Sequence, residues 1–183
     1  MRALLREISI ILILGIVISL GLPFIVQKYG IRQYCMEPSF QEGQQILVNK
    51  LAYTFHEPER GDVIILHPPP PYGPKVTPFI KRIIGLPGDT IEVKNGAVYV
   101  NGSQLDEPYI KEPHNYTSPR YKIPEDNYFV LGDNRNNAND SHKWGPLPRR
   151  DKDGRLNIIG KAWLSIWPPG KWGVVNNYPL QEQ

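Results

Sequence analysis

Two side chains in this sequence have chemistry that would suit covalent catalysis. Cys35 is the only cysteine among 183 residues and lies in the stretch CMEPS, where a thiolate could act as a nucleophile. Lys81 lies in the apolar stretch FIKRIIGLPGD, where burial would favour its neutral amine, which can accept a proton. The polar block GDNRNNANDSH at 132–142 could orient both groups, so the three stretches together indicate a candidate active site.

Each of the three stretches also has a simpler interpretation. A lone cysteine commonly packs as a small buried hydrophobe, and a lysine in a strand commonly extends to water. A run rich in Asn and Asp is typical of a solvated turn. Strand alternation favours the catalytic interpretation of Lys81, because it places Lys81 on the face opposite Ile80 and Arg82. If Arg82 faces water, Lys81 faces the interior.

The elements that would position these groups are mostly short strands. Apolar runs are separated by turn signals in QQILVNKLAY, EPERGDVIIL, TPFIKRIIGLPGDTIEVKNGAVYVNG, NYFVLGD and IIGKAWLSIW. Asn95-Gly96 predicts a tight hairpin within IEVKNGAVYV, because these residues readily adopt positive φ, and Asn101-Gly102 predicts a second turn. No convincing amphipathic helix follows Ile31. The pattern predicts a mainly β, all-β body.

The amino-terminal region predicts a membrane anchor. Ile8 to Val26 contains no charged residue over 19 positions, and as a helix it would span about 28 Å, close to a bilayer core. A cleaved signal peptide is the alternative, but this apolar run is longer than usual and no A-x-A pattern follows it. Arg2 and Arg6 precede the span and predict a cytoplasmic amino terminus, although Lys28 and Arg32 follow it.

These features predict an anchor over residues 1–28 and an extracytoplasmic catalytic body over 29–183. Within the body, the proline-rich segment 67–78 predicts a surface loop or hairpin tip, and the polar segment 103–126 predicts a small cap or insertion. The net charge of +3 is too small to indicate nucleic-acid binding. One cysteine excludes an internal disulfide or a multi-cysteine metal site, and nothing in the sequence suggests a metal or an organic cofactor.

The order of the motifs resembles the type I signal peptidases, which are membrane-anchored endopeptidases with a Ser/Lys dyad. CMEPS at 35–39 resembles the family's Ser-Met-x-Pro-Ser/Thr motif, and RGDV at 60–63 resembles its RGDVV segment. Residues 81–89 resemble the lysine motif KRxxGLPGD, and residues 132–142 resemble GDNRxNSxDSR with changes. The self-cleaving repressors share the dyad and β core, but they carry a DNA-binding region where this chain has an apolar span.

The resemblance implies a signal-peptidase-like all-β catalytic body with an N-terminal transmembrane helix. It also implies that residue 35 attacks the scissile carbonyl and that Lys81 acts as general base, with no cofactor and no metal. Partners would be preprotein signal peptides, the lipid bilayer and the secretion translocon, in the cell membrane or a thylakoid. The implied oxyanion and support residues are Gln33, Asp133, Asn134, Arg135, Asp140 and His142, and the implied substrate-binding residues are Ile31, Met36, Phe40, Phe79 and Ile80.

The sequence departs from this family at four positions of the motifs. Cys35 replaces the serine nucleophile, Gln33 replaces a serine of the oxyanion hole, and His142 replaces an arginine that pairs with an aspartate. Ala138 replaces a serine that hydrogen-bonds the lysine amine. Three interpretations follow: a working thiol peptidase, a serine enzyme whose nucleophile has been replaced, and an inactive relative that binds signal sequences or membrane partners without cleavage.

The carboxy-terminal stretch KAWLSIWPPGKWGVV predicts a second contact with the membrane. Trp163, Trp167 and Trp172 lie among lysines, a combination that is typical of lipid interfaces. A core strand is the alternative for this stretch, and Trp163 and Trp167 are expected to belong partly to it.

Overall fold

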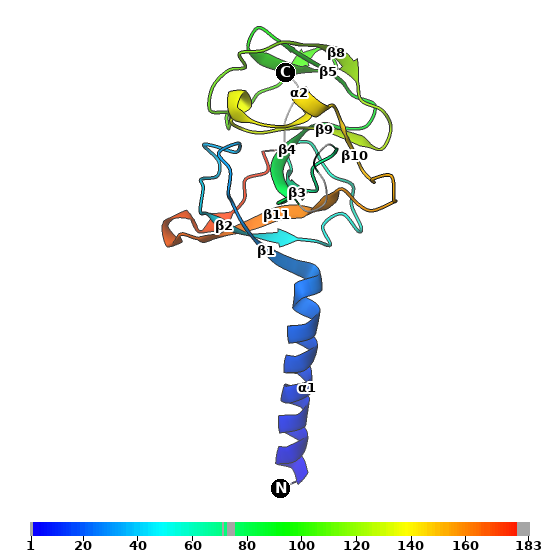
Figure 1. Ribbon diagram of the computed structural model, residues 1–183. Helices are drawn as coiled ribbons and strands as arrows, with labels where there is room; N and C mark the ends of the chain where they lie inside the picture. The colour runs from blue at the N-terminus through cyan, green and yellow to red at the C-terminus, as the bar shows by residue number, and fades with distance from the viewer. Residues whose placement is uncertain (1, 71, 73–75, 179–183) are drawn as a thin grey trace.

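The computed structural model describes residues 2–70, 72 and 76–178, and shows a long helix that extends away from a β body (Figure 1). Helix α1 spans Arg2–Ile25, and its side chains from Arg6 to Ile16 are exposed. The stretch Arg6–Ile25 is long and apolar enough to cross a membrane by its length and composition. The apolar helix expected from the sequence is therefore present, and strand β1 follows it directly.

The larger of two sheets contains eight antiparallel strands. Their order is β1 (Val26–Gly30), β2 (Gln45–Asn49), β11 (Ile158–Trp167), β3 (Val63–Leu66), β4 (Phe79–Gly85), β9 (Asn127–Leu131) and β10 (Leu147–Pro148), and β12 (Gly173–Val174) pairs with β11. Strand β1 lies at one edge of this sheet. Segment 67–78 joins the neighbouring strands β3 and β4, as a hairpin connection would, and its residues 71 and 73–75 lie outside the described part.

Strand β4 is buried along its whole length because side chains cover both of its faces. Ile80 belongs to one apolar cluster, Ile83 to a second and Ile84 to a third. Lys81 is inside the protein, as expected, but Arg82 is fully buried as well. The premise that Arg82 faces water is therefore wrong, since period-2 alternation separates inside from outside only where one face of a strand is solvated.

The smaller sheet contains four antiparallel strands in the order β7 (Ser103–Gln104), β6 (Ala97–Val100), β5 (Thr90–Lys94) and β8 (Ser118–Lys122). The predicted hairpin at Asn95-Gly96 is confirmed: the two residues have φ of 51° and 77°, and Lys94 pairs with Ala97. The turn at Asn101-Gly102 is confirmed as well, with φ of 53° and 94°. Positive φ at both central positions matches the right-handed twist of the flanking strands.

Two boundaries differ from those expected from the sequence. Residues 26–28 were assigned to the anchor, but they belong to β1, where Val26 pairs with Asn49 and Lys28 pairs with Leu47. Segment 103–126 was expected to be a small cap, but it supplies β7 and β8 to the smaller sheet. Between these strands the chain contacts the polar block, because the Lys111 N–H donates to Asp133 O at 3.1 Å.

Three short helical segments complete the fold: the 3₁₀ turns η1 (Arg135–Asn137) and η2 (Pro169–Lys171), and the four-residue helix α2 (Ser141–Trp144). The absence of a long amphipathic helix after Ile31 therefore holds for the described residues. Asp140 caps α2 by accepting a hydrogen bond from the His142 N–H. The polar block 132–142 is thus a folded strap after β9 rather than a solvated turn, because Asp133, Arg135 and Asp140 are each fully buried.

Candidate active site

Cys35 and Lys81 meet inside the β body although 46 positions separate them in the sequence. Lys81 Nζ lies 3.0 Å from Cys35 Sγ and also donates to Ile80 O at 2.9 Å. The side chains are almost inaccessible, with exposed fractions of 1% for Lys81 and 5% for Cys35. A thiol and an amine at this distance can exchange a proton directly, which is the geometry that an activated nucleophile requires.

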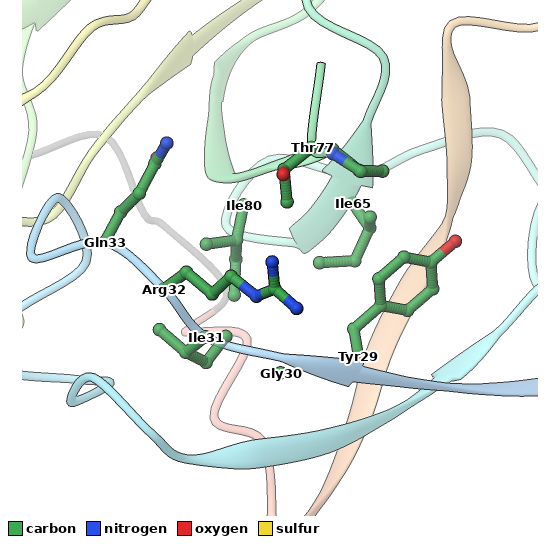
Figure 2. Close-up of a pocket in the computed structure, with 9 residues that line it drawn as sticks. Tyr29, Gly30, Ile31, Arg32, Gln33, Ile65, Thr77 and Ile80 are labelled. Carbon is green, nitrogen blue, oxygen red and sulfur yellow. The ribbon is translucent and has the colours of Figure 1, made fainter. Parts of the chain in front are cut away.

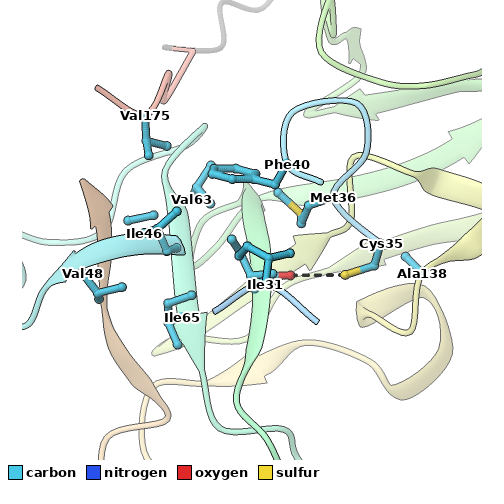
Figure 3. Close-up of a cluster of buried hydrophobic side chains, with 12 residues drawn as sticks. Ile31, Cys35, Met36, Phe40, Ile46, Val48, Val63, Ile65, Ala138 and Val175 are labelled. Atoms are coloured by element: carbon cyan, nitrogen blue, oxygen red, sulfur yellow. Dashed lines mark hydrogen bonds between the residues drawn. The ribbon is translucent and has the colours of Figure 1, made fainter. Parts of the chain in front are cut away.

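The turn that carries Cys35 is fixed by apolar side chains. Cys35 follows β1 and packs in a cluster with Met36 and Phe40, as Figure 3 shows. Met36 is fully buried, and its carbonyl accepts a hydrogen bond from the Phe40 N–H at 2.8 Å. Cys35 Sγ lies 3.7 Å from Ile80 O, so the sulfur stays beside the strand that supplies Lys81. The sulfur position is therefore set by core packing and not only by the lysine.

Gly132 and Asn134 hold the backbone of the Cys35 turn. A Cβ on Gly132 would lie 2.4 Å from Cys35 O and 2.6 Å from the Ala138 Cβ, so only glycine allows this approach. The Asn134 N–H donates to Cys35 O at 3.0 Å, and Asn134 Nδ2 donates to Tyr34 O at 3.0 Å. Asn134 therefore lies beside the nucleophile turn and holds it through both its backbone N–H and its side-chain amide.

Asp133 joins the same turn to the strand of Lys81. Its carboxylate accepts two hydrogen bonds from Arg82, from Nε at 2.9 Å and from the Nη2 atom at 2.7 Å. It also accepts one from Ser39 Oγ at 2.6 Å. The guanidinium stacks over the Tyr109 ring at 4.1 Å. A bidentate pair is directional, so Asp133 fixes Arg82, and through it the neighbouring Lys81, relative to Cys35.

Arg135, Asp140 and His142 hold Gly132 from both sides. The Arg135 Nε donates to Gly132 O at 3.1 Å, and Asp140 Oδ2 accepts the Gly132 N–H at 2.9 Å. His142 Nδ1 lies 2.6 Å from Asp140 Oδ1, which is the expected pair. The Tyr116 ring stacks on the His142 ring at 4.2 Å. All the predicted support residues of the strap thus lie in one network around the Cys35 turn.

Residues that the sequence did not single out complete this network. Glu107 forms a two-pronged ion pair with Arg135, and Arg135 Nη1 lies 3.0 Å from His114 Nε2. Burial and the Arg135 charge lower the pKa of His114 to about 4. His114 is therefore neutral near pH 7, accepts from Arg135 at Nε2 and donates from Nδ1 to Gly96 O. Glu107 and His114 come from the polar segment 103–126, which had no pattern that could have identified them.

A small pocket opens beside the pair, between the edge of β1 and the segment that enters β4 (Figure 2). Its volume is about 30 Å³, and it is lined by Tyr29, Gly30, Ile31, Arg32, Gln33, Ile65, Thr77, Pro78 and Ile80. Strand β4 pairs with β3 from Phe79 onward but with β9 only from Arg82 onward. An extended chain in this pocket would therefore have an unpaired strand edge on each side.

The five predicted substrate-binding residues separate into two groups. Ile31 and Ile80 line the pocket. Met36 and Phe40 are buried in the cluster under the Cys35 turn, and Phe79 belongs to a different cluster, 5.7 Å from the Tyr72 ring. None of these three residues lines the pocket, but the centre of the Phe79 ring lies 5.2 Å from Lys81 Nζ.

Two more of the departures from the family motifs, Gln33 and Ala138, lie close to Cys35. Gln33 Oε1 lies 3.6 Å from Cys35 Sγ, so the amide oxygen and not the amide nitrogen faces the thiol. Ala138 is buried in the cluster that contains Cys35, and its methyl group supplies no hydroxyl. Among the described residues, no group of three or more His, Cys, Asp or Glu side chains could hold a metal ion. Cys35 and Lys81 place a thiol and an amine in direct contact.

Comparisons with known proteins agree with this arrangement. Residues 3–167 match the family described as "Signal peptidase, peptidase S26". The chain is 41% identical to a probable signal peptidase I-1 from Synechocystis sp. over 92% of this chain and 85% of that protein. It is 40% identical to a signal peptidase I from Leptolyngbya laminosa over 91% and 81% of the two chains. A thylakoidal processing peptidase 1 from Arabidopsis thaliana is 38% identical over 74% of this chain and 40% of that protein.

The family match covers the apolar helix, the Cys35 turn, the strand of Lys81 and the polar strap, which are the parts that the structure brings together. The chain therefore belongs to the signal peptidase (peptidase S26) family.

Proposed function

We propose that this chain removes signal peptides from exported preproteins, with Cys35 as the nucleophile and Lys81 as the general base. One observation carries the assignment: Lys81 Nζ lies 3.0 Å from the sulfur of the only cysteine. Gln33 and Ile80, which lie beside that sulfur, line a pocket between two unpaired strand edges. The family membership and the relatives named as signal peptidases support it.

The reaction would proceed in two balanced steps. In the first, Lys81 takes the thiol proton while Cys35 Sγ bonds to the scissile carbonyl carbon, and the C–N bond breaks as Lys81 gives that proton to the leaving amine. In the second, Lys81 takes a proton from water as the hydroxide attacks the thioester carbon. The C–S bond then breaks, the new carboxy terminus of the signal peptide leaves, and Lys81 returns the proton to Cys35 Sγ. Cys35 and Lys81 thus divide one difficult amide hydrolysis into two easier steps, the formation and the hydrolysis of a thioester.

The oxyanion would be stabilised mainly by the backbone. Within the part of the chain that the structure describes, no group accepts a hydrogen bond from the Cys35 N–H, so this donor is free for a developing oxyanion. Gln33 could add its amide nitrogen only if the amide turns, because its oxygen now faces Sγ. The small pocket between Ile31 and Ile80 favours a small side chain before the scissile bond, such as alanine.

We place the chain in a membrane as a single-pass protein, with its amino terminus in the cytoplasm and the β body outside. Helix α1 supports the span, and the basic residues before it support the orientation. The membrane is the cell membrane or a thylakoid, and the thylakoidal relative supports the second location. The bilayer and the secretion translocon would then be partners, since signal peptides emerge there.

The test uses the full chain in detergent and a preprotein with an A-x-A cleavage site. The wild type should cleave it, whereas Cys35→Ala and Lys81→Ala should not. Lys122→Ala, which removes an exposed lysine of β8, serves as the matched control. Because Cys35 is the only cysteine, a thiol-alkylating reagent should abolish cleavage by the wild type.

The outcomes separate the remaining alternatives. Cleavage that persists in both alanine variants would refute the Cys35/Lys81 pair. An inactive wild type that is restored by Cys35→Ser would identify a replaced serine nucleophile. Binding of the preprotein without cleavage by any variant would identify a binding protein.

A further inference from the structure

A second, larger groove leads from the end of helix α1 to the small pocket. It is lined by Phe24, Gln27, Tyr29, Lys50, Leu51, His67, Pro78, Leu156, Ile158 and Ile159 and has a volume of about 550 Å³. We call it the anchor groove. It shares Tyr29 and Pro78 with the small pocket, and the last turn of α1 supplies Phe24. One continuous surface therefore runs from the end of the anchor to Gln33 and Ile80, which lie beside Cys35.

The lining of the anchor groove is mostly apolar and open to solvent. Leu51 and Leu156 have exposed fractions of 41% and 49%, and Phe24 is 74% exposed. Contiguous apolar side chains that remain exposed next to a binding pocket are typical of an interaction site. Lys50 is the basic residue of this lining, and its N–H donates to Ile25 O at 2.8 Å, which fixes it at the helix end.

The occupant follows from the strand geometry. An extended substrate that lies along the free edge of β1 exposes alternate side chains on one face, about 6.6 Å apart. If the residue before the scissile bond occupies the small pocket near Ile31, the third residue upstream faces the same side, and so does the fifth. The fifth upstream residue lies four positions, or about 13 Å of extended chain, from the first. In a substrate that runs parallel to β1 it therefore lies opposite Gln27, four positions before Ile31, and Gln27 lines the anchor groove.

We propose that the anchor groove is a specificity subsite that binds a bulky apolar side chain, such as leucine, at the fifth substrate residue upstream of the scissile bond. The proposal rests on the proposed function, because it takes the substrate to be a signal peptide cut at Cys35. The lining of Leu51, Leu156 and Ile159 provides apolar contact. Lys50 disfavours a basic side chain at the same substrate position, because like charges repel.

The experiment measures kcat/KM of the full chain in detergent for three peptides. They share an A-x-A cleavage site and differ only at the fifth upstream residue, which is Leu, Gly or Lys. The wild type should prefer the Leu peptide to the Gly peptide roughly tenfold, as expected for burying an aliphatic side chain, and should cleave the Lys peptide most slowly. The ratio of the kcat/KM values for two peptides, measured with the same enzyme preparation, does not depend on how much of the protein is folded.

Two groove variants and one control make the assignment specific. Leu156→Glu should reduce the Leu/Gly ratio to near one and should raise cleavage of the Lys peptide relative to the Leu peptide, because a carboxylate then faces the lysine. Leu51→Glu should act in the same direction if Leu156→Glu does not fold. Tyr121→Glu, at an exposed position of β8, should keep the wild-type ratios.

A wild type that cleaves the Leu and Gly peptides equally would overturn the proposal, and so would an unchanged ratio in both groove variants. If lipid fills the groove instead, the wild type should show no preference among the three peptides. Leu156→Glu should then only weaken association with liposomes. This outcome would also overturn the proposal. Affinity of the three peptides for Cys35→Ala provides a readout without cleavage. A Leu preference in binding with no cleavage by the wild type would support the subsite and refute the proposed function.

Discussion

Gly132 lies against the backbone of Cys35 so closely that a Cβ at position 132 would be 2.4 Å from Cys35 O. The contact is fixed from the other side as well, because Asp140 accepts the Gly132 N–H and Arg135 donates to its carbonyl. The strap 132–142 therefore fixes the backbone conformation of the turn that carries the nucleophile. Its polar side chains do not reach the substrate pocket, but they set the position of the sulfur.

Gly132→Ala should lower activity strongly with a smaller effect on folding. The added methyl group must displace the Cys35 turn, and a shift of about 1 Å at a nucleophile costs on the order of a hundredfold in rate. The measurement is kcat with a preprotein substrate, together with circular dichroism of the variant. Gly170→Ala is the matched control, since no atom lies within 4 Å of a Cβ there and its activity should be unchanged.

Asp133→Asn should destabilise the protein by about 3–5 kcal/mol, because it leaves the buried Arg82 charge without its carboxylate. The rate of cleavage should fall together with the free energy of unfolding, because the Asp133–Arg82 pair connects the Cys35 turn to β4. Urea unfolding followed by tryptophan fluorescence measures the loss. Glu92→Gln removes a carboxylate of the partly exposed pair with Lys94 and should have little effect. Equal stability of the two variants would contradict the structural role of Asp133.

The stability of the β body should decrease as the pH falls from about 6.5 to about 4, in part because of His114. Burial and Arg135 lower the pKa of His114 to about 4 in the folded chain, whereas the unfolded value is 6.5. The unfolded chain therefore binds a proton in this range that the folded chain does not, and stability is lost as the pH drops.

His114→Gln should flatten this part of the pH dependence. The comparison is the free energy of unfolding of wild type and variant at pH values between 7 and 4. His56→Gln, at an exposed histidine, should retain the wild-type slope. A slope that is unchanged by His114→Gln would assign the effect to other groups.

Trp172→Ala should weaken membrane association of a version that begins at Val26 and therefore lacks the helix. Trp172 and Val174 are 68% and 70% exposed, and Trp163 and Trp167 are about half exposed, so this end of β11 presents apolar side chains to the surroundings. Loss of one indole should reduce liposome binding roughly tenfold. Co-sedimentation with anionic liposomes measures it, with Tyr121→Ala as the control, and equal binding of all three proteins would contradict the prediction.

The sequence predicted those parts of the fold that depend on local chemistry. The hairpin at Asn95-Gly96 follows from positive φ, and α1 follows from an uncharged run of sufficient length. The meeting of Cys35 and Lys81 was implied by the family resemblance, because no local pattern relates two residues 46 positions apart. Arg82 was misplaced for the same reason: its burial depends on Asp133, which is 51 positions away.

The parts of the site that could not be predicted come from segment 103–126. Glu107 and His114 lie in a polar stretch without periodicity, and their partner Arg135 belongs to another part of the chain. A buried polar network becomes visible only when the tertiary structure brings complementary groups together. The pocket shows the same limit, since Met36, Phe40 and Phe79 have the right chemistry for a substrate but are used in the core.

Cys35→Ser should be less active than the wild type, and Ala138→Ser should partly restore that variant. A hydroxyl holds its proton more tightly than a thiol, so a serine nucleophile depends more on a well-oriented amine than a cysteine does. The family resemblance assigns position 138 to a serine that orients the lysine, and Ala138 packs in the cluster that contains Cys35. In the wild-type cysteine background, Ala138→Ser should therefore change activity little. Steady-state rates of the four proteins form a double-mutant cycle, and additive effects would mean that the thiol and the alanine are independent.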